Sequence, residues 1–203
     1  HADFIGLQEV DNKVRRSGSV DQAQTLGKAL GMHSAFGSFM DYQGGKYGLG
    51  ILSKHPILAA NEIKLPTGNE PRVALACKVQ LPDRREIMVV NLHFDWVEDD
   101  KFRFQQAKEL AKYLDTLTLP YVLMGDFNDQ PQSRTLDLLS RGTMAAVKPR
   151  QDRFTFPSMK PTIEIDFIFA APREDWQLNF SRVLNGKVTS DHRPFLAVVE
   201  LQP

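Results

Sequence analysis

The sequence lacks several features that would define a class of protein at once. It has a single cysteine, Cys77, which excludes a disulfide framework within the chain and a cysteine-rich zinc site. No apolar run approaches the roughly 18 residues that a membrane-spanning helix needs. Charge of one sign is not in excess, because 25 Lys and Arg balance 25 Asp and Glu. The sequence therefore argues against a protein that holds nucleic acid by a broad basic surface, although it does not exclude a locally basic cleft.

What is present is enough for a full hydrophobic core. The chain has 203 residues, of which 42% are hydrophobic, and it contains 13 Phe. It shows no repeat, low-complexity tract or linker, so we predict one domain over residues 1–203. The chain starts at His1 and enters a strand-like stretch at residues 4–7, so we expect native sequence to precede it. The sequence therefore carries no information on location in the cell.

Hydrophobic patterning predicts more strands than helices. We expect helices over residues 20–30, 102–114 and 132–141, the first with a capping box of Ser19 and Gln22 and with Gly31 at its end. We expect strands over residues 4–7, 48–53, 57–60, 72–80, 86–93, 121–124, 163–170, 177–184 and 195–201, and a loop over residues 36–47. Several strands follow one another without a helix between them. This order favours an α/β fold with two packed, mostly antiparallel sheets flanked by helices.

Polar residues that can bind a metal or move protons recur where the apolar runs end. Each has an ordinary structural explanation when taken alone: a surface carboxylate, a buried core histidine or a turn. Their recurrence along the chain favours a shared site. Carboxylates without cysteine suit Mg²⁺ or Mn²⁺ rather than zinc, and two histidines with acidic partners can serve the attacking water and the leaving oxygen of a phosphate ester. The residues are Glu9, Asn91, His93, Asp126, Asn128, Asp166, Asp191 and His192.

Six short motifs, in this order, resemble those of the endonuclease/exonuclease/phosphatase superfamily, and residues 154–169 resemble a largely uncharacterised bacterial branch of it. The motifs are Gly-Leu-Gln-Glu-Val (6–10), Leu-Gly-Ile-Leu-Ser (49–53), Val-Asn-Leu-His (90–93), Gly-Asp-Phe-Asn (125–128), Ile-Asp-Phe-Ile-Phe (165–169) and Ser-Asp-His-Arg-Pro (190–194). The resemblance spans residues 3–199. It implies a four-layer α/β sandwich with the active site at one end of the two sheets, and a further first strand upstream of Glu9 that the chain would lack.

The resemblance also implies roles on the metal side of such a site. Glu9 would be the main ligand of Mg²⁺, with Mn²⁺ as the alternative ion, and Asp191 would be a second carboxylate beside the metal. Asp126 would orient or activate the attacking water, and Asn128 would hold a phosphate oxygen.

The two histidines would lie on the other sides of the phosphate. His192 would contact the scissile phosphate, paired with Asp166, which would keep it protonated. His93 would be a candidate general acid, with Glu70 as its partner. Four further residues are candidates for binding the substrate, although structural salt bridges are the alternative explanation for the arginines: Asn91, Arg72, Arg103 and Arg193.

We therefore predict a metal-dependent hydrolase of phosphate esters, most simply a nuclease-like phosphodiesterase that acts as a monomer by in-line attack of water. The substrate would be a nucleic acid, a nucleotide or a phospholipid head group. The acidic segment 95–100 would repel a long polyanion. Two alternatives stay open: a phosphatase or phospholipid-head-group hydrolase of the same superfamily, and a catalytically weak binding module that keeps the fold. The loops do not indicate which substrate is bound.

Overall fold

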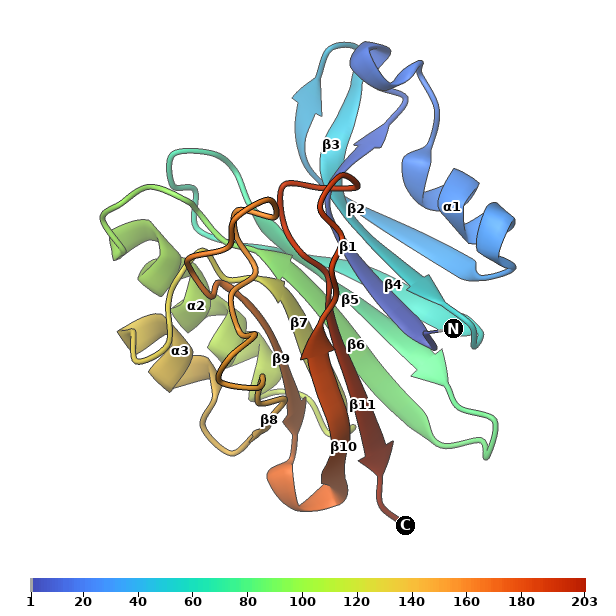
Figure 1. The fold of residues 1–203 in the computed structure, drawn as a ribbon. Coiled ribbons are helices and arrows are strands. Elements are labelled where there is room, and N and C mark those ends of the chain that lie inside the picture. The colour runs from blue at the N-terminus through green and yellow to red at the C-terminus, as the bar shows by residue number, and fades with distance from the viewer. Residues whose placement is uncertain (1) are drawn as a thin grey trace.

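Two layers of β-sheet form the centre of the structure, a computed structural model that describes residues 2–203 (Figure 1). The larger sheet has the strand order β4-β5-β6-β7-β9-β8, formed by β4 (Ile57–Lys64), β5 (Val73–Gln80), β6 (Glu86–His93), β7 (Tyr121–Asp126), β9 (Asp166–Ala171) and β8 (Met144–Ala145). The facing layer has a three-stranded sheet β1-β3-β2, formed by β1 (Phe4–Asn12), β3 (Gly45–Ser53) and β2 (His33–Tyr42), and a pair formed by β10 (Trp176–Val183) and β11 (Phe195–Leu201).

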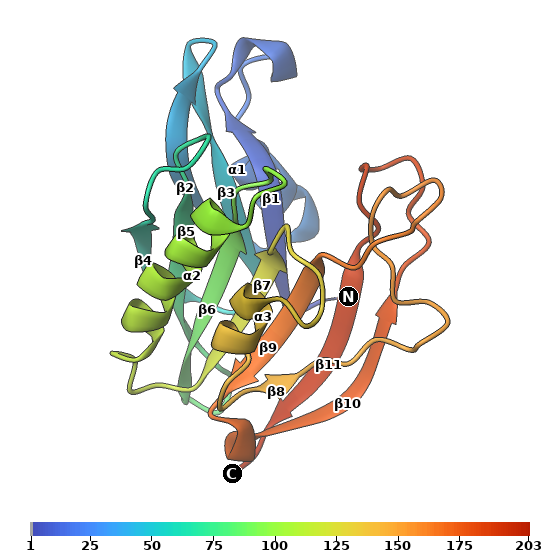
Figure 2. The same ribbon diagram turned by 90° about the vertical axis from the view of Figure 1, so that its left-hand side faces the viewer.

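Helices cover the outer faces of these sheets, so that the molecule has four layers. Figure 1 shows α1 (Gln22–Leu30) on one flank, and α2 (Lys101–Leu114) with α3 (Arg134–Leu139) on the other. Figure 2, turned so that the second flank faces the viewer, shows α2 and α3 in front of the six-stranded sheet. Short 3-10 turns lie at Arg15–Ser17 and Arg173–Asp175. The expected four-layer sandwich is therefore confirmed.

The alternation of side chains along β5 shows how one sheet serves two hydrophobic cores. Ala74 and Ala76 face α2 and α3 in one core, whereas Leu75, Cys77 and Val79 face the second sheet in the other. Successive side chains of a strand point to opposite faces, so a continuous apolar stretch is what a strand buried on both faces requires. Cys77 is fully buried, and burial raises the pKa of its thiol to about 12, which leaves it unreactive.

Several predicted elements differ from the structure: the strands predicted over residues 4–7, 57–60 and 163–170 run over Phe4–Asn12, Ile57–Lys64 and Asp166–Ala171, and three further differences have a clear cause. Residues 36–47, expected to be a loop, belong mostly to a hairpin of β2 and β3, in which Phe39 points into the core between the sheets. The first helix is capped by Asp21, whose carboxylate accepts from the Gln24 amide at 2.9 Å, rather than by Ser19. The last helix is shorter than predicted because Ser133 caps its start, accepting from the Leu136 amide at 3.3 Å.

Most of the pairing follows the expectation of antiparallel sheets. The hairpin of β5 and β6, the helix α2 and the last strand lie where the sequence predicts them. The parallel pairing of β6 with β7 is the exception among the paired strands of residues 2–203. Within the same residues β1 pairs only with β3, and β11 only with β10. The structure does not test the expected further strand upstream of β1. No helix of the described residues has the length and apolar character needed to cross a membrane.

The close approach of β1 to the larger sheet depends on Gly6. A Cβ atom there would lie 2.9 Å from Asn91 Oδ1 and 3.0 Å from Met124 Sδ. We therefore expect Gly6→Ala to lower the free energy of unfolding by about 1–3 kcal/mol, as overpacking of a core does. The matched control is Gly50→Ala, whose Cβ would meet that of Ala23 at an ordinary 3.4 Å. Urea unfolding measures both, and equal stability of the two variants would contradict the expectation.

Candidate active site

Strand register brings three predicted site residues together at one end of the six-stranded sheet. His93 ends β6 and pairs directly with Asp126, which ends the neighbouring β7. Asp126 in turn pairs with Asp166, the first residue of β9. Side chains at directly opposed positions of adjacent strands lie close together, so one imidazole and two carboxylates meet on a rigid edge.

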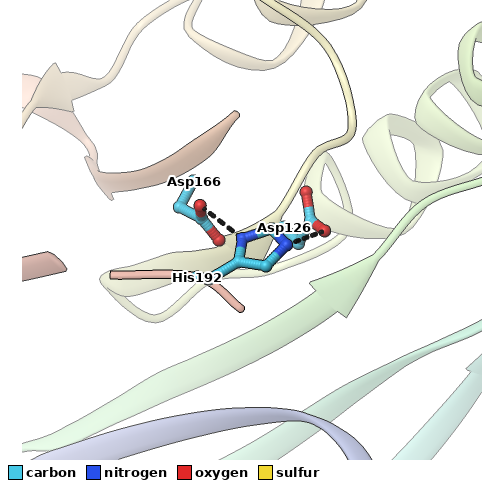
Figure 3. A group of neighbouring side chains, drawn as sticks. All are labelled: Asp126, Asp166 and His192. Carbon is cyan, nitrogen blue, oxygen red and sulfur yellow. Dashed lines mark hydrogen bonds and ion pairs between the residues drawn. The ribbon is translucent and has the colours of Figure 1, made fainter. Parts of the chain in front are cut away.

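His192 lies between the two carboxylates, as Figure 3 shows. Its Nδ1 is 2.9 Å from Asp166 Oδ2, and its Nε2 is 3.8 Å from Asp126 Oδ2. Burial alone would lower the pKa of His192, but the hydrogen bond and charge of Asp166, together with the charges of Asp126 and Asp191, raise it to about 9. His192 is therefore a cation at neutral pH, with its Nδ1 proton held by Asp166. The predicted pairing of these two residues is present.

Asp126 is the most enclosed carboxylate of the group. Its side chain is 6% exposed, and its Oδ1 accepts a hydrogen bond from the Asn128 amide at 2.8 Å. Burial, followed by the charge of Asp166, raises the pKa of Asp126 well above the usual range of an aspartate. Asn128 has a positive φ of 50°, and its side-chain amide donates to the Phe94 carbonyl at 3.0 Å. The turn after β7 therefore fixes Asp126 instead of leaving it mobile.

His93 differs from His192 in charge. Its Nε2 is 3.5 Å from Asp126 Oδ2, and its Nδ1 is 3.4 Å from Nη1 of Arg72. A guanidinium has no acceptor, so Nδ1 must accept from Arg72 and the single ring proton sits on Nε2. Burial, then the positive charges of Arg72 and His192, hold the pKa of His93 well below its ordinary value. His93 is therefore a neutral imidazole whose Nε2–H points toward Asp126.

The expected pair of Glu70 and His93 is not formed. The Glu70 carboxylate pairs instead with Nη2 of Arg72 at 3.0 Å, so the arginine lies between the acid and the histidine. The Arg72 side chain is 2% exposed, and its guanidinium also lies over the Phe39 ring at 4.9 Å. The sequence places Glu70 two residues from Arg72 but does not show that the arginine takes the carboxylate, because that depends on how residues 65–72 fold back.

Glu9 lies at a β-bulge within β1 rather than after a strand end. The register of β1 against β3 shifts between Leu7 and Val10, and Glu9 has a positive φ of 58°, so its side chain turns out to solvent. Burial, then the negative charge of Glu9, raises the pKa of Tyr47, whereas the charge of Arg72 lowers it. Glu9, Tyr47 and Arg72 are therefore neighbours, which places Glu9 at the same end of the sheets as His93.

Asn91 joins the two sheets. Its Nδ2 donates to the Leu7 carbonyl at 2.9 Å and to the Gly50 carbonyl at 3.0 Å, and its Oδ1 accepts from Gln8 Nε2 at 2.7 Å. Both donor hydrogens are used within the protein, and the side chain is fully buried. Asn91 thus holds the backbone and the side chain next to Glu9. A direct contact with substrate stays a prediction.

The other arginines predicted to bind substrate anchor loops around the site. Arg103 donates to the carbonyls of Asp95, Val97 and Glu98, which follow β6. The Arg193 Nε donates to the Ser158 carbonyl at 2.7 Å, and its amide donates to the Thr155 carbonyl. Sequence reasoning missed Phe156, whose ring lies 4.9 Å from that of His192. No periodic pattern could have revealed it, because residues 146–165 contain no helix or strand of their own.

The chemistry of the donor set fits a hard divalent cation. Asp126, Asp166 and His192 offer ligand atoms that lie within 4.8 Å of one another. However, His192 carries a proton on each nitrogen, so we regard it as a poor ligand in this state. Glu9 and Asp191 are exposed carboxylates, and among residues 2–203 neither forms an ion pair with Lys or Arg. Carboxylate oxygens without thiolates are what Mg²⁺ or Mn²⁺ prefers.

Comparisons with known proteins agree with this architecture. The sequence matches the model of the Endonuclease/Exonuclease/phosphatase family over residues 1–192, so the chain belongs to that family. No curated protein matches the chain by sequence.

Three solved structures illustrate the likeness of the fold. An endonuclease/exonuclease/phosphatase from Bacteroides vulgatus is 23% identical, with a TM-score of 0.80 over 98% of this chain and 85% of that one. The human Nocturnin catalytic domain with bound sulfate is 18% identical, with a TM-score of 0.79 over 98% and 81%. The mannosyl-6-phosphatase of Bacteroides thetaiotaomicron VPI-5482 is 20% identical, with a TM-score of 0.78 over 98% and 85%.

The charge of His192 depends on Asp166 and can be measured without turnover. We expect Asp166→Asn to lower the pKa of His192 from about 9 toward the ordinary 6.5, because the hydrogen-bonded charge is removed. The wild-type His192 ring keeps its second proton up to about pH 9, whereas in Asp166→Asn it would lose this proton nearer pH 6.5. An NMR titration of the histidine ring protons in the presence of chelator follows this change. Asp3→Asn, which alters an exposed carboxylate beside His55, is the matched control, and equal His192 curves in all three proteins would contradict the expectation.

Proposed function

We propose that this protein is a Mg²⁺-dependent phosphodiesterase that hydrolyses its substrate by in-line attack of water. The observation that carries the proposal is the position of Asp126 between two imidazoles of different charge, His192 at 3.8 Å and His93 at 3.5 Å. The carboxylate of Asp126 can accept a proton, and each of the two imidazoles beside it has an N–H that can donate. The three groups meet at one point. Hydrolysis of a phosphate ester needs these groups together.

Asp126 is the proposed acceptor of the proton from the attacking water. Its buried position makes it more basic than an ordinary aspartate, which brings its proton affinity closer to that of a base working near neutral pH. The Asn128 amide occupies Oδ1, so Oδ2 is the oxygen that faces the imidazoles and is available to a water molecule.

The two histidines have separate proposed roles. The cationic His192 donates from Nε2 to a phosphate oxygen and stabilises the negative charge that develops there, while Asp166 holds the other ring nitrogen. The neutral His93 donates from Nε2 to a second oxygen. As a neutral imidazole it is a weak acid, so we propose that it orients the phosphate, and that the leaving oxygen takes its proton from solvent water.

A bound Mg²⁺ would be held by Glu9 and Asp191, and it would supply Lewis-acid stabilisation of the phosphoryl oxygens. Glu9 would be oriented for this by its bulge and by the hydrogen bonds of Asn91 to the preceding residues. One chain supplies all of these groups, so we expect activity from the monomer.

The charges around the site favour a diester over a monoester. A phosphate monoester carries nearly two negative charges at neutral pH, whereas a diester carries one. The three arginines that were candidates for additional phosphate contacts all have partners within the protein: Arg72 with Glu70, Arg103 with loop carbonyls and Arg193 with Ser158. Of these three arginines, only Arg193 faces no carboxylate within the described residues, so little positive charge remains among them to balance a second negative charge. The phosphatase alternative finds support in the likeness to a mannosyl-6-phosphatase, which is one of fold alone.

Removing the cationic imidazole tests the proposal. We expect His192→Ala to lower kcat on bis(p-nitrophenyl) phosphate by about 100-fold or more, because a donor to the developing charge is lost. Wild-type activity should require Mg²⁺ or Mn²⁺ and be abolished by chelator, and p-nitrophenyl phosphate should be the poorer substrate. His33→Ala, which removes an exposed histidine at the start of β2, is the matched control.

Three results would contradict the proposal. An unchanged rate in His192→Ala would exclude the assigned role of the imidazole. An unchanged rate with chelator would exclude the metal. If the wild type hydrolyses no ester in a panel of plasmid DNA, RNA, aryl phosphodiesters, inositol phosphates and sphingomyelin, the catalytically weak binding module is the better description.

A further inference from the structure

A cavity of about 340 Å³ opens next to the candidate active site. Two aromatic side chains and two isoleucines form its apolar walls, and the remaining wall is polar. The lining residues are Trp96, Arg103, Asn128, Asp129, Gln130, Phe156, Ile163 and Ile165. This volume is within the range of small-molecule binding sites, which combine apolar walls with a few placed polar groups.

Three of the lining residues connect the cavity to the catalytic groups. The Phe156 ring lies 4.9 Å from the ring of His192. Ile165 directly precedes Asp166, and its carbonyl accepts from the Phe127 amide at 2.9 Å. Asn128 follows Asp126 by two residues and is bound to it through its backbone amide. A phosphate held between the histidines would therefore have one of its substituents at the mouth of this cavity.

The polar wall contains two buried atoms without a hydrogen bond. Within residues 2–203, Arg103 Nε and Asp129 Oδ2 have no hydrogen-bond partner, and they face each other at 3.5 Å, too far apart for a good hydrogen bond. The Arg103 side chain is 7% exposed and that of Asp129 is 12% exposed. Arg103 and Asp129 thus form a buried ion pair that is not a full hydrogen bond, and the Asp129 carboxylate keeps acceptor capacity for a donor on a ligand.

The aromatic wall of the cavity contains a large apolar side chain that is exposed instead of buried. Trp96 is 59% exposed, although a large apolar side chain normally gains from burial. Its position is nevertheless fixed, because Arg103 binds the carbonyls on both sides of it, those of Asp95 and Val97. An exposed indole on an anchored loop, beside a phenylalanine, is suited to stack on a flat or apolar ring face.

We propose that this cavity binds an uncharged ring that carries hydrogen-bond donors and is attached to the scissile phosphate. The ring face would contact Trp96 and Phe156, and its N–H or O–H groups would donate to Asp129. A nucleobase and a hexose both have this chemistry. A second phosphate is disfavoured, because Arg103 is the one cation among the described residues of the cavity lining and its charge is already balanced by Asp129 at 3.5 Å. The inference rests on the proposed function for the position of the phosphate.

Three diesters with the same p-nitrophenyl leaving group test the cavity: one with thymidine through its 5′ oxygen, one with methyl mannoside through its 6 oxygen, and one with methanol. We expect kcat/KM for at least one ring ester to exceed that for the methyl ester by about tenfold or more, as stacking on one aromatic side chain provides. The ester with the higher kcat/KM shows whether the cavity prefers a nucleobase or a hexose.

The variants Trp96→Ala and Asp129→Asn should each reduce this preference for the ring ester and leave the methyl ester nearly unchanged. Their matched controls are Phe180→Ala, an exposed aromatic residue on β10, and Asp41→Asn, an exposed carboxylate beside β3. Equal rates for the three esters in the wild type, or an equal loss on all three in the variants, would overturn the proposal.

A binding measurement separates failure of the cavity from failure of the catalytic proposal. The chain has two tryptophans, Trp96 in the cavity wall and Trp176 in the core between the sheets. Thymidine or methyl mannoside at millimolar concentration should change the fluorescence of the wild type but not that of Trp96→Phe. If no ester is hydrolysed and this change still occurs, the proposed function fails and the cavity stands. If esters are hydrolysed and neither ring changes the fluorescence, the cavity proposal fails alone.

Discussion

The parallel pairing of β6 with β7 is the constraint on which the site depends, because it sets His93 opposite Asp126. Parallel neighbours need a crossover connection, and α2 provides it while covering the outer face of the sheet. The register also requires Gly125, which has a φ of 141° and lies opposite Leu92. A Cβ atom there would lie only 2.1 Å from the Leu92 carbonyl oxygen. Close packing thus requires glycine at the first position of Gly-Asp-Phe-Asn, and this packing fixes the position of Asp126, which follows it.

That fixed position explains how two histidines of the same ordinary pKa come to differ in charge. His192 lies on the Asp166 side of Asp126, where two carboxylates hold its proton. His93 lies on the other side, where Arg72 faces its Nδ1 and burial removes water. Their neighbours, not the residue type, decide their protonation. A single buried carboxylate can then hold one imidazolium and one neutral imidazole within 4 Å of the same oxygen.

The sequence could predict what depends on local pattern and could not predict what depends on packing between distant segments. Strand periodicity located β5, β6 and β11, and the motifs identified Asp126, Asp166 and His192 as one group. The hairpin of β2 was missed because its outward face is polar and its turn resembles a loop. The pairing of Glu70 with Arg72, and the use of Asn91 to join the sheets, needed the folded chain. In both of these cases the elements were predictable, but which side chain meets which partner is decided by how the chain folds back on itself and by how the two sheets pack.

Positive and negative side chains balance one another around the candidate active site, as they do in the whole chain. Arg72 and Arg103 each face a carboxylate, Arg193 donates to a carbonyl, and the cavity beside them is lined by Asp129. Affinity for a long polyanion would have to come from surface cations away from these groups, and it would fall steeply with salt. Affinity for a small ester can arise instead from the ring that its phosphate carries, through apolar contact with Trp96 and Phe156. Selectivity of this molecule would then lie in the organic part of the substrate, while the phosphate would be bound by His93 at the end of β6 and by His192, which Asp166 at the start of β9 holds.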